Sequence, residues 1–199
     1  MTILALNKPA VWRACLESGL EVTRISGGMF MNYLALGSGR EATEQGLIDD
    51  KVIWDVPAGR VEMPVKADGS APRLMMTSLR DLGMVVAAAC DLEEGRWRES
   101  MEIVGETVGI HDVTRVIEEV TGRRMEVSTV GTEELQRRVD AVEGFGGTRE
   151  EIFRTMISEI NLLVLEEMEG MCVLRPVANE LCPHIRPMGL REIIEAAWG

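Results

Sequence analysis

The sequence predicts an α/β fold in a single domain. Segments with the alternating pattern of a β-strand take turns along the chain with segments whose apolar residues recur at helical spacing. Gly19 and Gly122 directly follow two of the helical segments, and glycine is the residue at which a helix commonly ends. With 199 residues, of which 46% are hydrophobic, the chain is long and apolar enough to bury a core.

The start of the sequence predicts a helix and then a strand. Val11, Ala14 and Cys15 recur at helical spacing within residues 8–18, and Gly19 follows them. Residues 20–25 alternate and contain β-branched side chains, which predicts a strand. A helix, a glycine and a strand in this order are half of a βαβ unit.

Caps and glycines mark the later elements. Ser78 with Asp81, and Thr148 with Glu151, have the spacing of a capping box, which predicts the start of a helix at each place. The further helices expected are 29–36 (a short helix or turn), 79–91, 110–121, one opened by Thr132, one from Thr148 to about Gly170 with an apolar stripe of Ile152, Met156, Ile160 and Leu163, and 190–198. The further strands expected are 51–56, 60–65, 73–77, 101–104 and 125–130, with loops at 37–51 and 144–147.

Charge and hydropathy exclude several classes of partner. The formal net charge is −12, and the short basic pairs Arg123-Arg124 and Arg137-Arg138 have glutamates nearby, so we expect no nucleic-acid partner. No apolar run approaches the roughly 20 residues of a membrane-spanning helix. The N-terminus lacks the basic region and cleavage site of a signal peptide. We therefore expect no membrane contact and a cytoplasmic location.

The residue types that commonly bind metals or phosphates are not clustered in the sequence. The cysteines have no paired spacing and only His111 and His184 supply imidazoles, so we expect no metal site. No glycine-rich loop joins a first strand to a helix, as the usual dinucleotide fingerprint requires. The glycines at 27–28, 37–39 and 144–147 lie in other contexts.

Six stretches of the chain have the order and spacing of motifs from one known family. Lys8 precedes a helical segment, Gly19 and a strand ending at Thr23, as in the pattern KxxVRxxIExxG and the strand after it. The other matching stretches are Ser26-Gly-Gly-Met-Phe-Met-Asn-Tyr33, Thr77-Ser-Leu-Arg-Asp-Leu-Gly83, Ile103-Val-Gly105, Glu118-Glu-Val-Thr-Gly122, and Asn179-Glu-Leu-Cys-Pro183 continuing to Glu192. In these stretches the chain resembles the NmrA-like and isoflavone-reductase-like family of atypical short-chain dehydrogenases, and the resemblance covers residues 8–198.

The resemblance implies the C-terminal, substrate-facing portion of such a protein, without the N-terminal half that grips the dinucleotide. It implies one domain over 1–199, truncated at its N-terminus. A partial Rossmann-like sheet with helices is then expected in 1–105, and a smaller α+β substrate-binding part in 106–199. Missing strands would leave an unpaired sheet edge and an apolar face, so we expect a homodimer.

The resemblance also implies roles for individual residues. Lys8 is expected to face the nicotinamide and the substrate as general acid or base; residue type alone favours an exposed lysine beside a helix start. Gly27, Gly28 and Phe30 are expected to face the cofactor. The residues expected to bind substrate are Met29, Phe30, Tyr33, Met76 and His184, for which the alternatives are core packing and, for His184, a surface position.

The function implied is an NAD(P)-dependent reductase that acts on a hydrophobic small molecule, such as a secondary metabolite, with NADP(H) or NAD(H) as cofactor. The missing phosphate loop leaves open a cofactor-independent isomerase, cyclase or dehydratase that uses the same pocket. A non-catalytic, redox-sensing regulator that binds a protein partner is the third possibility.

Overall fold

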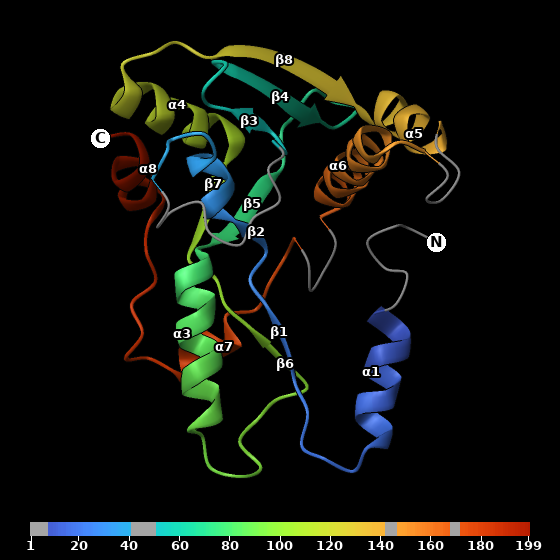
Figure 1. Cartoon of the computed structure of the whole chain (residues 1–199), viewed down its shortest axis with the longest axis vertical. Coiled ribbons are helices and arrows are strands. Elements are labelled where there is room, and N and C mark those ends of the chain that lie inside the picture. The colour runs from blue at the N-terminus through green and yellow to red at the C-terminus, as the bar shows by residue number, and fades with distance from the viewer. Residues whose placement is uncertain (1–7, 41–50, 142–146, 168–171) are drawn as a thin grey trace.

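A computed structural model describes residues 8–40, 51–141, 147–167 and 172–199 of the chain. Helices and strands alternate along it, which confirms the predicted α/β class (Figure 1). The helices are α1 (Lys8–Glu17), the 3-10 helix η2 (Met31–Ala35), α3 (Leu79–Cys90), α4 (Ile110–Thr121), α5 (Thr132–Asp140), α6 (Arg149–Leu165), α7 (Val177–Leu181) and α8 (Leu190–Trp198). The strands are β1 (Arg24–Ser26), β2 (Met29–Phe30), β3 (Trp54–Asp55), β4 (Arg60–Val65), β5 (Arg73–Thr77), β6 (Ser100–Glu102), β7 (Glu106–Gly109) and β8 (Glu126–Gly131).

The described strands form three small sheets. β1 pairs with β6 in parallel. β5 lies between β2, which is parallel to it, and β7, which is antiparallel. β4 lies between β3, which is antiparallel to it, and β8, which is parallel.

Among the described helices, none has both the length and the apolar composition that a membrane-spanning segment needs.

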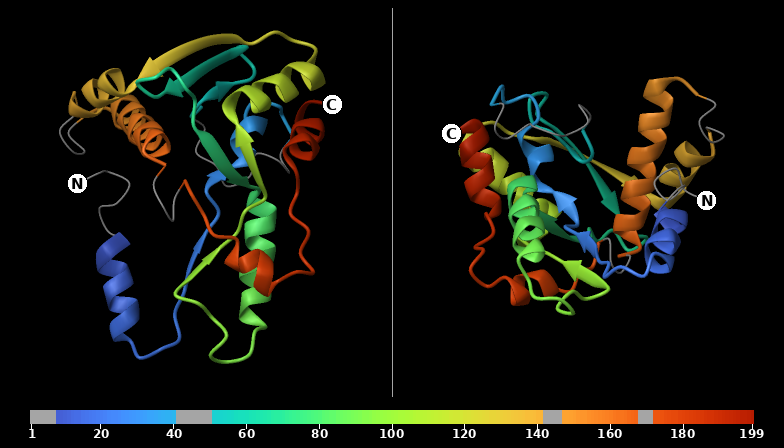
Figure 2. Two further views of the ribbon diagram at one scale, coloured as in Figure 1. Left: turned by 180° about the vertical axis from the view of Figure 1, so that it is seen from behind. Right: turned by 60° about the horizontal axis from the view of Figure 1, so that its bottom comes forward.

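The helix α1 lies beside the body of the molecule, joined to it by the segment that leads into β1 (Figure 2). None of its residues is buried. Its contact with the strand is a cation–π interaction, in which the Arg24 guanidinium lies 4.7 Å from the centre of the Trp12 ring. In the described part of the chain β1 pairs on one side only, with β6. An unpaired strand edge and an unburied helix therefore lie next to each other.

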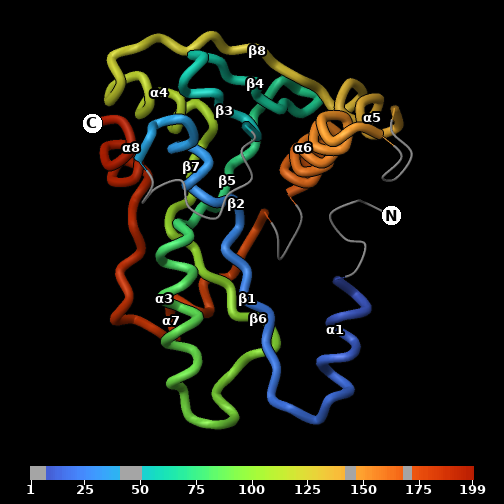
Figure 3. Tube along the Cα trace, viewed as in Figure 1, coloured from blue at the N-terminus to red at the C-terminus, as the bar shows by residue number. Residues whose placement is uncertain are grey.

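Two glycine bends join the first sheet to the second. The chain runs from β1 through Gly27-Gly28 into β2, and from β6 through Gly105 into β7 (Figure 3). Both bends pass close to the β5 backbone, since a Cβ at Gly28 would lie 2.2 Å from the Met75 carbonyl oxygen and one at Gly105 would lie 2.8 Å from that of Met76. Side chains larger than glycine would push the two sheets apart here.

The predicted strand 20–25 is shorter and later in the structure, where β1 covers Arg24–Ser26. Its ladder starts where the Arg24 amide donates to the Glu99 carbonyl oxygen. The segment before Ser100 does not continue the ladder, and the amides of Gly95 and Trp97 in this segment donate hydrogen bonds to the Glu21 carboxylate instead. The alternation in residues 20–23 therefore has no strand to pair with.

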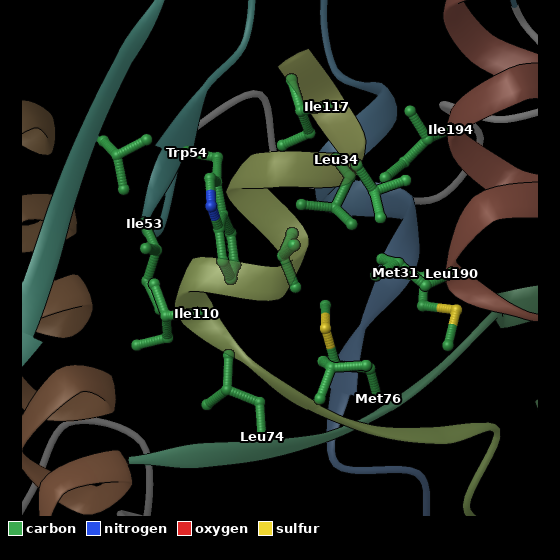
Figure 4. Packing of buried hydrophobic residues seen from close by; sticks show 14 of the residues in the cluster. Met31, Leu34, Ile53, Trp54, Leu74, Met76, Ile110, Ile117, Leu190 and Ile194 are labelled. Atoms are coloured by element: carbon green, nitrogen blue, oxygen red, sulfur yellow. The ribbon is translucent and has the colours of Figure 1, made fainter. Parts of the chain in front are cut away.

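The main core lies between the β5 and β4 sheets and the helices α4 and α8 (Figure 4). The amphipathic helix predicted at 110–121 is confirmed as α4, with Ile110, Val113 and Ile117 buried and Gly122 capping it at a φ of +66°. Trp54 of β3 reaches this helix, and its indole N–H donates to the Thr114 hydroxyl over 3.1 Å. A second cluster packs α3 and α7 against β6.

Helix α6 begins at the predicted capping box of Thr148 and Glu151, which is confirmed. The predicted stripe is covered only in part: Leu163 is buried, while Ile152, Met156 and Ile160 are half-buried. Polar side chains of α6 are buried as well, namely Thr155, Ser158, Glu159 and Asn161. Because α6 packs against both α5 and β4, two of its faces are covered and no single apolar stripe describes it. The expected loop at 144–147 lies outside the described residues except for Gly147, and the segment 168–171 after α6 lies outside them entirely.

Other differences are local. Residues 29–36, expected as a helix or turn, divide into β2 and η2, and the strand expected at 51–56 is limited to Trp54–Asp55. Strand β7, which was not predicted, pairs antiparallel with β5. The Ser78 cap is half of the predicted box: its hydroxyl accepts from the Asp81 amide, but the Asp81 carboxylate accepts from the distant Met188 amide.

Candidate active site

A cavity of about 370 Å³ lies where β1 ends and the chain bends into β2. In parallel sheets, ligands bind in the crevice outside the carboxyl ends of the strands, and β1 is parallel to β6. We call it the apolar cavity. Segments far apart in sequence line it, with the residues Lys8, Ile25, Ser26, Gly27, Gly28, Met29, Phe30, Tyr33, Val52, Leu82, Ile160, Val164 and Cys172.

The structure brings most of the predicted site residues to this one cavity. Lys8, Gly27 and Gly28 line it, as do Met29, Phe30 and Tyr33. Two further residues do not reach it. Met76 is fully buried in β5, where it pairs with Met29 across the sheet, and His184 is exposed between α7 and α8.

Lys8 is the only charged side chain among the described residues that line the apolar cavity. It is exposed, stands first in α1, and forms no ion pair with another described residue. A cation at a helix N-terminus faces the positive end of the helix dipole, and α1 has no acid in its first turn to offset this. The position of this charge is therefore not explained by helix stability.

The glycines at the bend are explained by the fold. Gly28 has a φ of +64°, and the Cβ it lacks would meet the β5 backbone rather than a ligand. A Cβ at Gly27 would make ordinary contacts, at 3.6 Å, with Leu82, Phe30 and Thr77. The bend itself places Phe30 at the cavity, because β2 starts immediately after it.

Sequence reasoning missed the far wall of the apolar cavity. Val52 precedes β3, Ile160 and Val164 belong to α6, and Cys172 follows the segment after α6. None of these residues belongs to a motif. The packing of α6 against β4 brings Ile160 and Val164 to the site, and no spacing in the sequence signals that contact.

Two polar residues from the stretches that resemble the reductase family hold the framework together. The fully buried Asp81 carboxylate accepts hydrogen bonds from the Ser78 hydroxyl and the Met188 amide, both at 2.7 Å. The Asn179 side chain exchanges two hydrogen bonds of 3.0 Å with the Val104 backbone. These bonds fix the C-terminal segments to α3 and to the end of β6.

A second, larger cavity of about 920 Å³ lies between α5, α6 and the outer face of the β3–β4–β8 sheet. We call it the polar groove. Arg138 lies in its wall and donates to both carboxylate oxygens of Glu62, over 2.7 and 3.1 Å, and to Glu134 over 2.8 Å. The Glu62 carboxylate raises the pKa of the Arg138 guanidinium above its usual value. The groove shares the lining residue Val52 with the apolar cavity.

In the described part of the chain, no group of three or more histidine, cysteine or acidic residues is arranged to hold a metal ion. Among the described residues that line the apolar cavity, the side chains that carry an exchangeable proton are those of Lys8, Ser26, Tyr33 and Cys172.

No family model matches the sequence, and no curated protein matches it. Solved structures do share the fold. An NADPH-dependent quinone oxidoreductase from Escherichia coli superposes with a TM-score of 0.66 at 14% identity, over 98% of this chain and 62% of that one. Leucoanthocyanidin reductase from Vitis vinifera gives a TM-score of 0.62 at 13% identity, over 95% and 59%. An isoflavone reductase gives 0.62 at 12%, over 95% and 56%.

The chain shares its fold with part of these reductases. It spans less than two thirds of the length of each. The predicted α/β fold with a partial Rossmann-like sheet is thereby confirmed. At identities of 12–14% the likeness concerns the fold, and function has to be argued from the site.

Proposed function

We propose that this chain carries the substrate side of an NAD(P)H-dependent reductase for a hydrophobic small molecule, with the apolar cavity as the active site. The observation that carries the proposal is the position of Lys8, which is the one charged residue among the described residues that line the cavity, at the carboxyl end of a parallel strand. The fold shared with reductases, among them an NADPH-dependent quinone oxidoreductase, supports the same reading.

The cavity suits the ring end of a nicotinamide cofactor. Phe30, Met29 and Ile25 offer an apolar surface against which a flat ring can pack. The phosphates have no comparable match, since Lys8 is the only cation among the described residues that line the cavity and no glycine-rich loop in the sequence joins a first strand to a helix. Groups outside the apolar cavity would have to hold the phosphates.

Lys8 is proposed to donate the proton that accompanies reduction and to accept it when the reaction runs in reverse. When bound, NAD(P)H supplies a hydride; the protein then needs a proton donor within reach of the reacting atom. Lys8 meets the positional requirement because it lies at the rim of the cavity and no described carboxylate holds its ammonium group. Its exposure leaves it able to exchange protons with water.

The substrate is proposed to be apolar and to bind against β2, η2 and α6. Phe30 and Tyr33 supply aromatic surface, while Ile160 and Val164 close the opposite wall. A volume of about 370 Å³ lies within the range of pockets that take small molecules. Cys172 adds a polarisable thiol to the same wall.

Calorimetric titration of the purified chain with NADPH and NADH tests the cofactor part of the proposal. We expect binding in the micromolar range, because the ring end of the cofactor has an apolar surface to cover. If neither nucleotide gives a heat of binding at millimolar concentration while an apolar ligand still binds, the proposed NAD(P)H-dependent reduction at the apolar cavity is refuted. A cofactor-independent isomerase, cyclase or dehydratase at the same cavity would then take its place.

A further inference from the structure

The apolar cavity and the polar groove lie along one face of α6. Ile157 and Ser158 line the groove, while Ile160 lines the cavity one turn further along the helix. Val52 lines both spaces. The two cavities are therefore neighbours that share Val52 in their linings, and a ligand long enough to pass Val52 would reach from the apolar surface into the groove.

The wall of the groove is rich in charge but almost balanced. Four basic and five acidic side chains line it: Lys51, Arg60, Arg138 and Arg154, with Asp55, Glu62, Glu126, Glu134 and Glu150. Several of these charges neutralise one another, as in the pairs of Arg138 with Glu62 and of Arg154 with Glu150. An anion or a cation entering the groove finds no clear excess of opposite charge.

Such a wall offers both hydrogen-bond donors, on its basic side chains, and hydrogen-bond acceptors, on its acidic side chains. A guanidinium only donates and a carboxylate only accepts, whereas a hydroxyl group does both. A neutral group with several hydroxyls can therefore bond to both kinds of side chain without burying a net charge. Arg138, which is 29% exposed and held by two carboxylates, is fixed in place before any ligand arrives.

We propose that the substrate of the apolar cavity carries a neutral, hydroxyl-rich group, such as a sugar, that lies in the polar groove. The inference rests on the proposed function, because it places the apolar part of the substrate against Phe30 and Tyr33. The sugar lies beyond Val52, against Arg138 and the side chains of the β4–β8 face. The substrate class is thus a glycosylated aromatic compound.

A matched pair of ligands tests this inference: the isoflavone daidzein and its 7-O-glucoside, titrated calorimetrically in the presence of excess NADP⁺. We expect the glucoside to bind about tenfold more tightly, which is the gain from one or two net hydrogen bonds. Arg60→Met and Arg138→Met should each reduce this preference and leave daidzein affinity unchanged. Arg60 is the safer variant for folding, since it is exposed and forms no ion pair with another described residue.

The control variant is Arg115→Met. Arg115 forms comparable ion pairs, with Asp112 and Glu119, on α4 and lines neither cavity. The preference of the Arg115→Met variant for the glucoside over daidzein should equal that of the unaltered chain. Thermal melting of all variants checks that each is folded.

The outcomes separate the inference from the proposed function. If daidzein binds and the glucoside binds no more tightly, the groove is not a sugar site and the inference is overturned, while the apolar cavity stands. A preference that survives both groove variants also overturns it. If neither compound binds, the proposed substrate class fails and the inference fails with it.

Discussion

A Cβ atom at position 28 would lie 2.2 Å from the carbonyl oxygen of Met75, so Gly28 and the β5 backbone are in the closest contact that the bend allows. The bend sets the direction in which β2 leaves β1, and β2 carries Phe30 to the apolar cavity. The geometry of the site thus depends on Gly28, although a side chain at this position would meet the β5 backbone and not a ligand.

We predict that Gly28→Ala destabilises the chain by at least about 2 kcal/mol, because it adds a steric clash to the cost of a positive φ. Gly69→Ala is the matched control. Gly69 has a φ of +82° but open space around it, so only the backbone cost of roughly 1–2 kcal/mol applies. Urea denaturation of both variants measures the difference, and equal losses would contradict the account of the bend.

The buried carboxylate of Asp81 gives a second prediction. Asp81→Ala leaves the Ser78 hydroxyl and the Met188 amide without their acceptor, which should cost roughly 2–4 kcal/mol of stability. Asp112→Ala, at an exposed acid paired with Arg115, should cost less than about 1 kcal/mol. A small loss for Asp81→Ala would show that the segment before α8 is held by other contacts.

The capping box of α6 predicts a dependence of stability on pH. Hydrogen bonds from the Thr148 amide and hydroxyl to the Glu151 carboxylate lower the pKa of Glu151 below its usual value of 4.5. A carboxyl group with a lower pKa in the folded state stabilises the fold above pH 4.5, and this contribution is lost as the pH falls through the folded pKa. Glu151→Gln should therefore reduce the loss of stability on acidification, as measured by urea denaturation at a series of pH values. An unchanged pH profile would count against the box in solution.

Exposed apolar side chains on α1 and just after it predict self-association. Val11, Leu16 and Leu20 are 61%, 56% and 74% exposed beside a strand that, among the described residues, pairs on one side only. We expect dimers at micromolar concentration in light scattering, and a shift toward monomers for Val11→Glu with Leu16→Glu. Particles of monomer mass in the unaltered chain would refute this prediction.

The sequence was informative wherever a local rule determined the structure. Helix α4 has a complete apolar face and a glycine at its end, and the α6 cap has both partners within four residues, so each could be predicted. Most of the near wall of the apolar cavity could likewise be proposed from two stretches of motif, one beginning at Lys8 and one covering Ser26 to Tyr33.

The rest depends on contacts between distant segments. Val52 and Ile160 reach the cavity only because α6 packs on the β4 sheet, and the polar groove exists for the same reason. Residues 20–23 alternate like a strand but lack a partner, because the segment before Ser100 turns to bind Glu21. Met76 has the residue type of a pocket wall, yet the β2–β5 pairing buries it completely.

The most direct test of the proposed active site is NADPH oxidation by the unaltered chain, Lys8→Ala and Arg13→Ala, with a quinone and an isoflavone as acceptors. Arg13 is an exposed cation on the same helix that does not line the cavity, so its variant controls for loss of charge on α1. We predict turnover by the unaltered chain and by Arg13→Ala, and a loss of at least about a hundredfold for Lys8→Ala with an unchanged melting temperature. Full turnover by Lys8→Ala would contradict the account.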